Sequence, residues 1–149
     1  VMTASEMMEA VLALCEDSPP DIYVSAAAIS DFAPEQVPGK IPSGKPVDIR
    51  LRPLPKVIDE VMKRCNPFTI AFKLGENAAS EAEDLLEKGA SLVFANQPGM
   101  LGATAGKAVI ITGTERVEVE GNKEELPPAL WREAVRHSAL GTYQGTSVR

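Results

Sequence analysis

The sequence has few of the residues that build metal centres or disulfide frameworks. Its 149 residues include two cysteines and one histidine. Cys15 and Cys65 lack CxxC spacing, and His137 is the single imidazole, so a zinc site is not expected. We interpret both cysteines as reduced residues that pack in the interior.

Long apolar runs are also missing. No stretch is long and apolar enough to span a bilayer. The start at Val1-Met2-Thr3 lacks the basic region, apolar run and small-residue cleavage site of a secretion signal. We therefore expect a cytoplasmic protein without a membrane partner. A GxGxxG loop is absent as well, which argues against a Rossmann-like reductase domain.

The chain does have enough apolar material for one folded domain, because 44% of its residues are hydrophobic. The net charge of −6 argues against a nucleic-acid partner. This charge is unevenly distributed: residues 1–39 hold seven acids and no Lys or Arg, whereas residues 40–64 hold seven basic residues against three acids. Such a segment suits a small polyanion, although a solvated strand and helix face would give the same pattern.

The spacing of apolar residues predicts an α/β domain over 1–140. We expect helices over about 4–15, 55–64, 80–88 and 126–135, strands over 22–29, 47–52, 68–72 and 91–95, and a hairpin of 108–112 with 117–120. The runs 22–29, 68–72 and 91–95 are typical of strands buried on both faces in a mostly parallel sheet, whose ligand sites lie beyond the carboxyl ends of the strands. The alternating segment 47–52 suggests a strand near a sheet edge. Residues 30–45 and 96–106 are predicted to be loops, the first mobile, and 141–149 a disordered tail.

At three places the residue types suggest a role in ligand binding, and each place also has an explanation without such a role. Asp31 follows a predicted strand, where its carboxylate could hydrogen-bond a ribose, a base amine or a metal, or simply form an Asx turn. Lys40 and Lys45 flank a flexible loop and could close over phosphates, or serve only solubility. Phe72 and Lys73 could give a base-stacking surface beside a cation, although Phe72 could equally be a core residue.

Several segments together resemble the phosphopantothenoylcysteine synthetase domain of the bifunctional Dfp/CoaBC family, in archaeal form. They are Thr3-Ala4-Ser5-Glu6-Met7, Ser25-Ala26-Ala27-Ala28-Ile29-Ser30-Asp31-Phe32, Gly39-Lys40-Ile41, Phe72-Lys73-Leu74 and the stretch from Leu85 to Asn96. The resemblance covers roughly residues 1 to 112. It implies a Rossmann-like three-layer fold and a homodimer. The reaction it implies is a CTP-dependent, Mg²⁺-assisted ligation of 4′-phosphopantothenate and L-cysteine through an acyl-cytidylate.

The resemblance also implies roles for individual residues. Lys40 would hold the triphosphate and act in catalysis, Asp31 would fix the nucleoside, and Phe72 would pack on the base. Backbone near the nucleotide would come from Ser25, Ala26 and Ala27 and from Pro55, Lys56, Val57 and Ile58, the latter at a helix N-terminus that favours anions. Lys88 would reach the phosphates. The metal ligands stay unassigned.

Two departures from the family pattern shape the expected function. Asp84 stands where many bacterial members have a lysine, so Lys73 is a candidate replacement. The family's glycine-rich loop and its Ser-Asn segment would precede Val1, which predicts a fragment, a cleaved product or one piece of a split enzyme that needs a missing N-terminal segment or partner chain. A non-catalytic nucleotide-binding or dimerisation module is the alternative. The sequence leaves open CTP versus ATP and whether a flavin-dependent decarboxylase is joined upstream.

Overall fold

The computed structural model describes residues 1–35, 38–41, 43–96, 105–122 and 124–138. The predicted tail 141–149 and most of the predicted loop 96–106 therefore lie outside the described residues. The helices are α1 (Ala4–Asp17), α2 (Val57–Cys65), α3 (Ala78–Glu87) and α4 (Leu126–His137). The strands are β1 (Ile22–Ser25), β2 (Phe32–Pro34), β3 (Leu51–Pro53), β4 (Phe68–Leu74), β5 (Leu92–Asn96), β6 (Ala105–Ile111) and β7 (Arg116–Asn122).

Five strands form the main sheet in the order β1-β4-β5-β6-β7. The pairs β1–β4 and β4–β5 are parallel, and β6 and β7 add an antiparallel hairpin beside β5. The prediction of a mostly parallel α/β sheet with an appended hairpin is thus confirmed. In this arrangement β1, β4 and β5 all end at one edge of the sheet, where ligands bind in folds of this kind.

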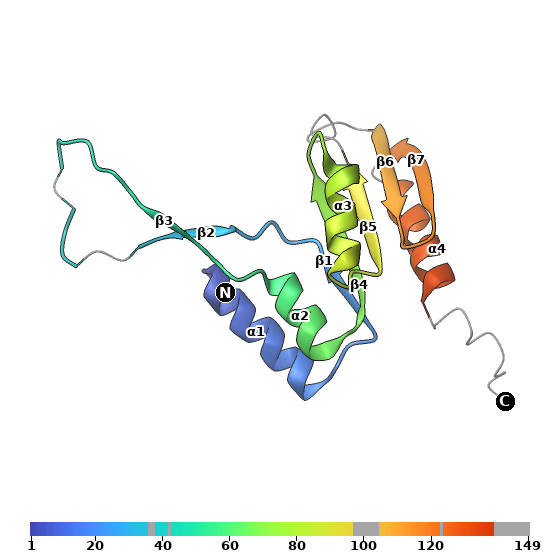
Figure 1. The fold of residues 1–149 in the computed structure, drawn as a ribbon, viewed down its shortest axis with the longest axis horizontal. Coiled ribbons are helices and arrows are strands. Elements are labelled where there is room, and N and C mark those ends of the chain that lie inside the picture. The colour runs from blue at the N-terminus through green and yellow to red at the C-terminus, as the bar shows by residue number, and fades with distance from the viewer. Residues whose placement is uncertain (36–37, 42, 97–104, 123, 139–149) are drawn as a thin grey trace.

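Helices cover both faces of the sheet and make three layers (Figure 1). Alternate residues of the strands point to opposite faces, so Ala71 and Val93 belong to the core under α3, whereas Ile70 and Leu92 belong to the core that includes α4. The three-layer prediction is confirmed.

The helix ends follow the expected local chemistry. The Thr3 side chain accepts a hydrogen bond from the Glu6 backbone N–H, and the Glu6 carboxylate accepts from the Thr3 N–H, which is the capping box that the sequence predicts. Asn66 ends α2 in the left-handed region, with φ of 46°. Gly89 follows α3 with φ of 111°, a value that favours glycine.

Two predicted strands differ from the structure. The segment 22–29 is not a strand buried on both faces: only Ile22–Ser25 is extended, and it is half-exposed because β1 lies at the edge of the sheet order. The segment 47–52 is not part of the main sheet. Within the described residues the observed strand β3 pairs with β2, and Val47, Ile49 and Leu51 are exposed. The prediction was wrong because an alternating pattern shows the periodicity of a strand but not which strand is its partner.

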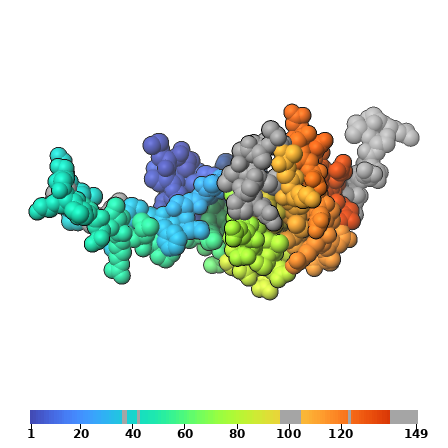
Figure 2. Space-filling model, turned by 90° about the horizontal axis from the view of Figure 1, so that it is seen from above, coloured from blue at the N-terminus to red at the C-terminus, as the bar shows by residue number. Residues whose placement is uncertain are grey.

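The β2–β3 ribbon and the described chain between its strands form a projection that we call the arm, residues 31–35, 38–41 and 43–54. The arm extends away from the main sheet and its helices (Figures 1 and 2). Its base is closed by a hydrogen bond from the Leu54 N–H to the Asp31 carbonyl at 2.8 Å. Among the residues described, no helix is long and apolar enough to cross a membrane.

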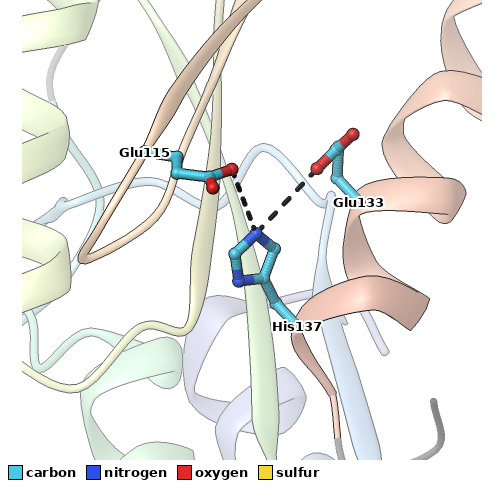
Figure 3. A group of neighbouring side chains, drawn as sticks. All are labelled: Glu115, Glu133 and His137. Carbon is cyan, nitrogen blue, oxygen red and sulfur yellow. Dashed lines mark ion pairs between the residues drawn. The ribbon is translucent and has the colours of Figure 1, made fainter.

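Helix α4 is fastened to the β6–β7 turn by a charged cluster. Glu115, Glu133 and His137 offer ligand-type atoms within 4.8 Å of one another, and His137 Nε2 lies 3.8 Å from Glu115 and 3.9 Å from Glu133 (Figure 3). The Arg136 guanidinium already pairs with both carboxylates. We therefore interpret the cluster as an ion-pair network rather than as a metal centre.

Candidate nucleotide-binding site

A cavity of about 160 Å³ lies between the end of β1, the start of α2 and β4. It is lined by Ser25, Ala27, Ile29, Ser30, Asp31, Pro55, Lys56, Val57, Ile58, Ala71, Phe72, Lys73 and Leu85. Pockets that enclose drug-sized ligands usually hold roughly 300–1,000 Å³. This cavity is therefore smaller than a pocket that encloses a whole ligand of that size.

An exposed ion pair stands where the arm joins the cavity. Lys56 Nζ lies 3.5 Å from Asp31 Oδ1, and both side chains are about half exposed. The Ser30 hydroxyl donates to the Phe32 carbonyl at 2.7 Å, which fixes the turn before the arm. A polar ligand can compete for either member of such a pair because exposed ion pairs contribute little stability.

The first turn of α2 borders the cavity. Pro55 precedes the helix, Lys56 is its N-cap residue, and no side chain accepts a hydrogen bond from the first backbone N–H groups. Free N–H groups and the helix dipole favour an anion at this end. Asp59 and Glu60 lie in the same turn, but each is paired with a basic residue, Asp59 with Lys88 and Glu60 with Arg64.

Strand β4 contributes a second cation and an aromatic ring. Lys73 Nζ lies 2.6 Å from Glu81 Oε2 on α3. The ring of Phe72, 39% exposed, packs on Phe94 at a centroid distance of 5.4 Å and a tilt of 45°. The Phe72 ring is therefore held against a core residue while part of it remains exposed.

Most of the predicted site residues line this one cavity, and three do not. Ala26 is outside the lining although both of its neighbours belong to it. Lys88 pairs with Asp59 of α2 at 4.0 Å, just behind the helix turn at the cavity. Lys40 is exposed and lies on the arm, which extends away from the main sheet and its helices (Figure 1).

Sequence reasoning missed part of the lining. Ala71 is brought to the cavity by its register with Ser25 across β1 and β4, and Leu85 reaches it from α3. Neither residue carries a chemical signal in the sequence. Ile29 and Ser30 lie inside a segment that the resemblance covers, so the motif itself could have pointed to them.

A second hollow of about 430 Å³ lies between the ends of β4 and β5, the start of α3 and the β6–β7 hairpin. Gly75, Asn96 and Ala108 are among its lining residues, and its charged members are Glu76, Lys107, Glu118 and Glu120. Lys107 pairs with Glu120 at 3.2 Å, which leaves the lining acidic. An anionic ligand would therefore meet less like charge in the first cavity than in this one.

Sequence comparison gives the family of this domain. The profile of the DNA/pantothenate metabolism flavoprotein C-terminal domain matches residues 1–137. The chain belongs to this family. The predicted membership, made from short motifs, is thus confirmed over nearly the whole chain.

Two curated archaeal proteins are similar in sequence to this chain. The chain is 34% identical over 143 residues to the coenzyme A biosynthesis bifunctional protein CoaBC of Thermococcus kodakarensis, covering 89% of this chain and 35% of that protein. It is 31% identical over 135 residues to the CoaBC protein of Methanocaldococcus jannaschii, covering 85% and 33%. The chain thus spans about a third of the length of these relatives.

The crystal structure of the DNA/pantothenate metabolism flavoprotein from Streptococcus pneumoniae has the same fold. The TM-score is 0.74 at 19% identity, with 92% of this chain and 72% of that chain covered. At this identity the likeness supports the Rossmann-like architecture and no finer conclusion.

Proposed function

We propose that this domain binds CTP for the ligation of 4′-phosphopantothenate with L-cysteine. The observation that carries the proposal is the cavity at the carboxyl end of β1, where Lys56, Lys73 and the free N-terminus of α2 meet in a protein of net charge −6. Family membership and the CoaBC relatives, named for coenzyme A biosynthesis, supply the reaction class.

The proposed chemistry has two steps. The carboxylate of 4′-phosphopantothenate attacks the α-phosphate of CTP, which forms an acyl-cytidylate and releases pyrophosphate. The amine of cysteine then attacks the acyl carbon, and CMP leaves. In both steps negative charge develops on phosphate oxygens, and fixed cations and backbone N–H groups stabilise it.

Four lining residues and Lys88 have roles in this proposal. Lys56 and Lys73 offset the charge of the phosphates, and the first N–H groups of α2 donate to a phosphate oxygen. Asp31 accepts a hydrogen bond from the ribose or from the amine of cytosine, and Phe72 packs on the base. Lys88 stands behind the helix and orients Asp59, from which it could move toward the phosphates.

Magnesium enters this proposal as part of the substrate, Mg–CTP. Mg²⁺ is usually held by one or two carboxylates together with substrate phosphates and water. Asp31 is the one carboxylate among the described lining residues. A single carboxylate suits an ion that is already bound to the phosphates better than a metal site built entirely from protein ligands. The ion would reduce the charge that the attacking carboxylate meets.

Lys40 is the proposed catalytic residue, and its position on the arm limits how it can reach the phosphates. Because the arm extends away from the main sheet and its helices, Lys40 reaches the phosphates only if the arm folds back or if a second copy supplies it (Figure 1). The arm exposes five large apolar side chains: Phe32, Ile41, Val47, Ile49 and Leu51. Exposed apolar groups concentrated on one projection support the homodimer.

Binding is tested on the chain by calorimetry with Mg–CTP, Mg–ATP and Mg–UTP. We expect Mg–CTP to bind most tightly and Lys56→Ala to weaken it by about tenfold or more, in the range of a hydrogen bond to a charged group. Lys63→Ala is the matched control, because Lys63 is exposed on the last turn of the same helix. Absence of heat with all three nucleotides on folded protein would contradict the proposal.

Ligation is tested in the full-length polypeptide that carries this domain, by following CMP release with phosphopantothenate and cysteine. Lys40→Ala should lower the rate while Mg–CTP still binds. Mixing Lys40→Ala protein with Lys56→Ala protein distinguishes the two routes for Lys40. Recovery of activity indicates an arm supplied by the second copy, and no recovery indicates that each arm serves its own chain. Full activity of Lys40→Ala would exclude the catalytic role, and binding without any CMP release would favour a non-catalytic nucleotide-binding module.

A further inference from the structure

The two cysteines of the chain, 50 positions apart in sequence, lie together at one end of a helix pair. Cys15 is in the last turn of α1, and Cys65 is the last residue of α2. Cys15 is 4% exposed and belongs to the core between these helices, and Cys65 packs against the same core. Cys65 itself is only partly buried, and both are free thiols.

An ion pair beside the thiols supports this juxtaposition. The residues next to the thiols, Glu16 and Arg64, form an ion pair of 3.1 Å between the same two helices. The pKa of the Cys15 thiol is raised, first by burial and then by the nearby Cys65 thiol. The shared core and the adjacent ion pair therefore place the two thiols at the same end of the helix pair.

We infer that Cys15 and Cys65 form an oxidisable dithiol, a modification site at which a peroxide or a small soluble disulfide joins α1 to α2. The site is distinct from the nucleotide cavity, since neither cysteine lines it. The inference stands whether or not the domain binds CTP.

The step with a peroxide balances as follows. The thiolate of Cys65, the more exposed sulfur, attacks a peroxide oxygen, and the O–O bond breaks to leave a sulfenic acid on Cys65 and a hydroxide that takes up a proton to form water. Cys15 sulfur then attacks the sulfur of Cys65, the S–O bond breaks, and a second water leaves. Two thiols are oxidised and one hydrogen peroxide is reduced to two waters.

The position of the dithiol gives the disulfide a structural effect. It would close a loop that contains β1, the arm and all of α2, a long loop of the kind for which a cross-link removes much entropy from the unfolded chain. It would also tie down the far end of α2, whose first turn lines the cavity. The bond needs the sulfur atoms to approach to about 2.05 Å, and the position of both cysteines near helix ends favours that approach.

The experiment treats the folded, reduced protein with hydrogen peroxide or with oxidised glutathione. Intact mass and peptide mapping should show loss of two hydrogen atoms and a Cys15–Cys65 linkage within one chain. The melting temperature should rise by roughly 10 °C in the oxidised form and return after reduction. Cys65→Ser should fold like the parent, because that position is partly exposed, and should show neither the linkage nor the rise.

Cys15→Ala provides the second variant, and it too should lose the linkage. Both thiols remaining free under these conditions would overturn the inference. So would oxidation of Cys65 to sulfinic acid with Cys15 still reduced, or linkage only between different chains. A Cys65→Ser protein that gains the same stability on oxidation would refute the proposed cause of the shift.

Discussion

Phe72→Ala should weaken Mg–CTP binding by about 5-fold to about 150-fold. Phe72 belongs to the cavity lining, and its ring, 39% exposed, packs on Phe94 at a centroid distance of 5.4 Å, which limits its movement. Stacking of a base on an aromatic side chain contributes roughly 1–3 kcal/mol, which converts to that range of affinity. Calorimetry with Mg–CTP and with cytidine alone measures it, and both ligands should lose affinity by a similar factor because the contact is to the base.

The substitution also removes an aromatic pair, worth roughly 0.5–1.5 kcal/mol of folding stability, so thermal denaturation must show that the variant is folded at the assay temperature. Leu74→Ala is the matched control. Leu74 lies two residues along β4 on the same face, is 45% exposed, and is outside the cavity lining. Affinity within twofold of the parent for Phe72→Ala, or an equal loss for Leu74→Ala, would refute the stacking role.

Three further outcomes are expected. Lys73→Met should weaken the binding of Mg–CTP by about tenfold and that of cytidine very little, because Lys73 is proposed to contact phosphate. Equal losses of affinity for both ligands in calorimetry would mean that Lys73 does not contact the phosphates. Val61→Ala should lower the free energy of unfolding by about 2 kcal/mol in urea denaturation, since Val61 is fully buried between α1 and α2; a change under 0.5 kcal/mol would mean that this core repacks freely. Asn66→Ala should lower the free energy of unfolding by about 1 kcal/mol and Asn66→Gly by less, because Asn66 has φ of 46°, a left-handed conformation that glycine adopts without strain. Equal effects of the two substitutions in urea denaturation would contradict this explanation.

Local signals in the sequence predicted the elements that are stabilised locally. The capping box at Thr3, the helix stop at Gly89 and the hairpin after β5 are each determined by residues close in sequence, and each is present. The buried strand β5 was recognisable because every face of it contacts protein, which leaves a continuous apolar run.

The errors concern which partners a segment has, and this depends on residues far away. Ile22–Ser25 has the composition of a central strand but lies at the edge of the sheet order. Val47, Ile49 and Leu51 alternate like a half-buried strand but are exposed on the arm. The cavity shows the same limit of prediction from sequence. Asp31 and Phe72 belong to motifs that the sequence shows, whereas Ala71 and Leu85 line the cavity because of how β4 and α3 pack.

The edge position of β1 has a consequence for assembly. Within the described residues β1 is hydrogen-bonded to β4 alone, so its other side offers backbone donors and acceptors to an incoming strand. The strand is only four residues long, and short edge strands are a common defence against uncontrolled pairing between molecules. A segment added there would lie directly beside Ser25, which lines the cavity, so strand pairing at this edge would also change the wall of the cavity.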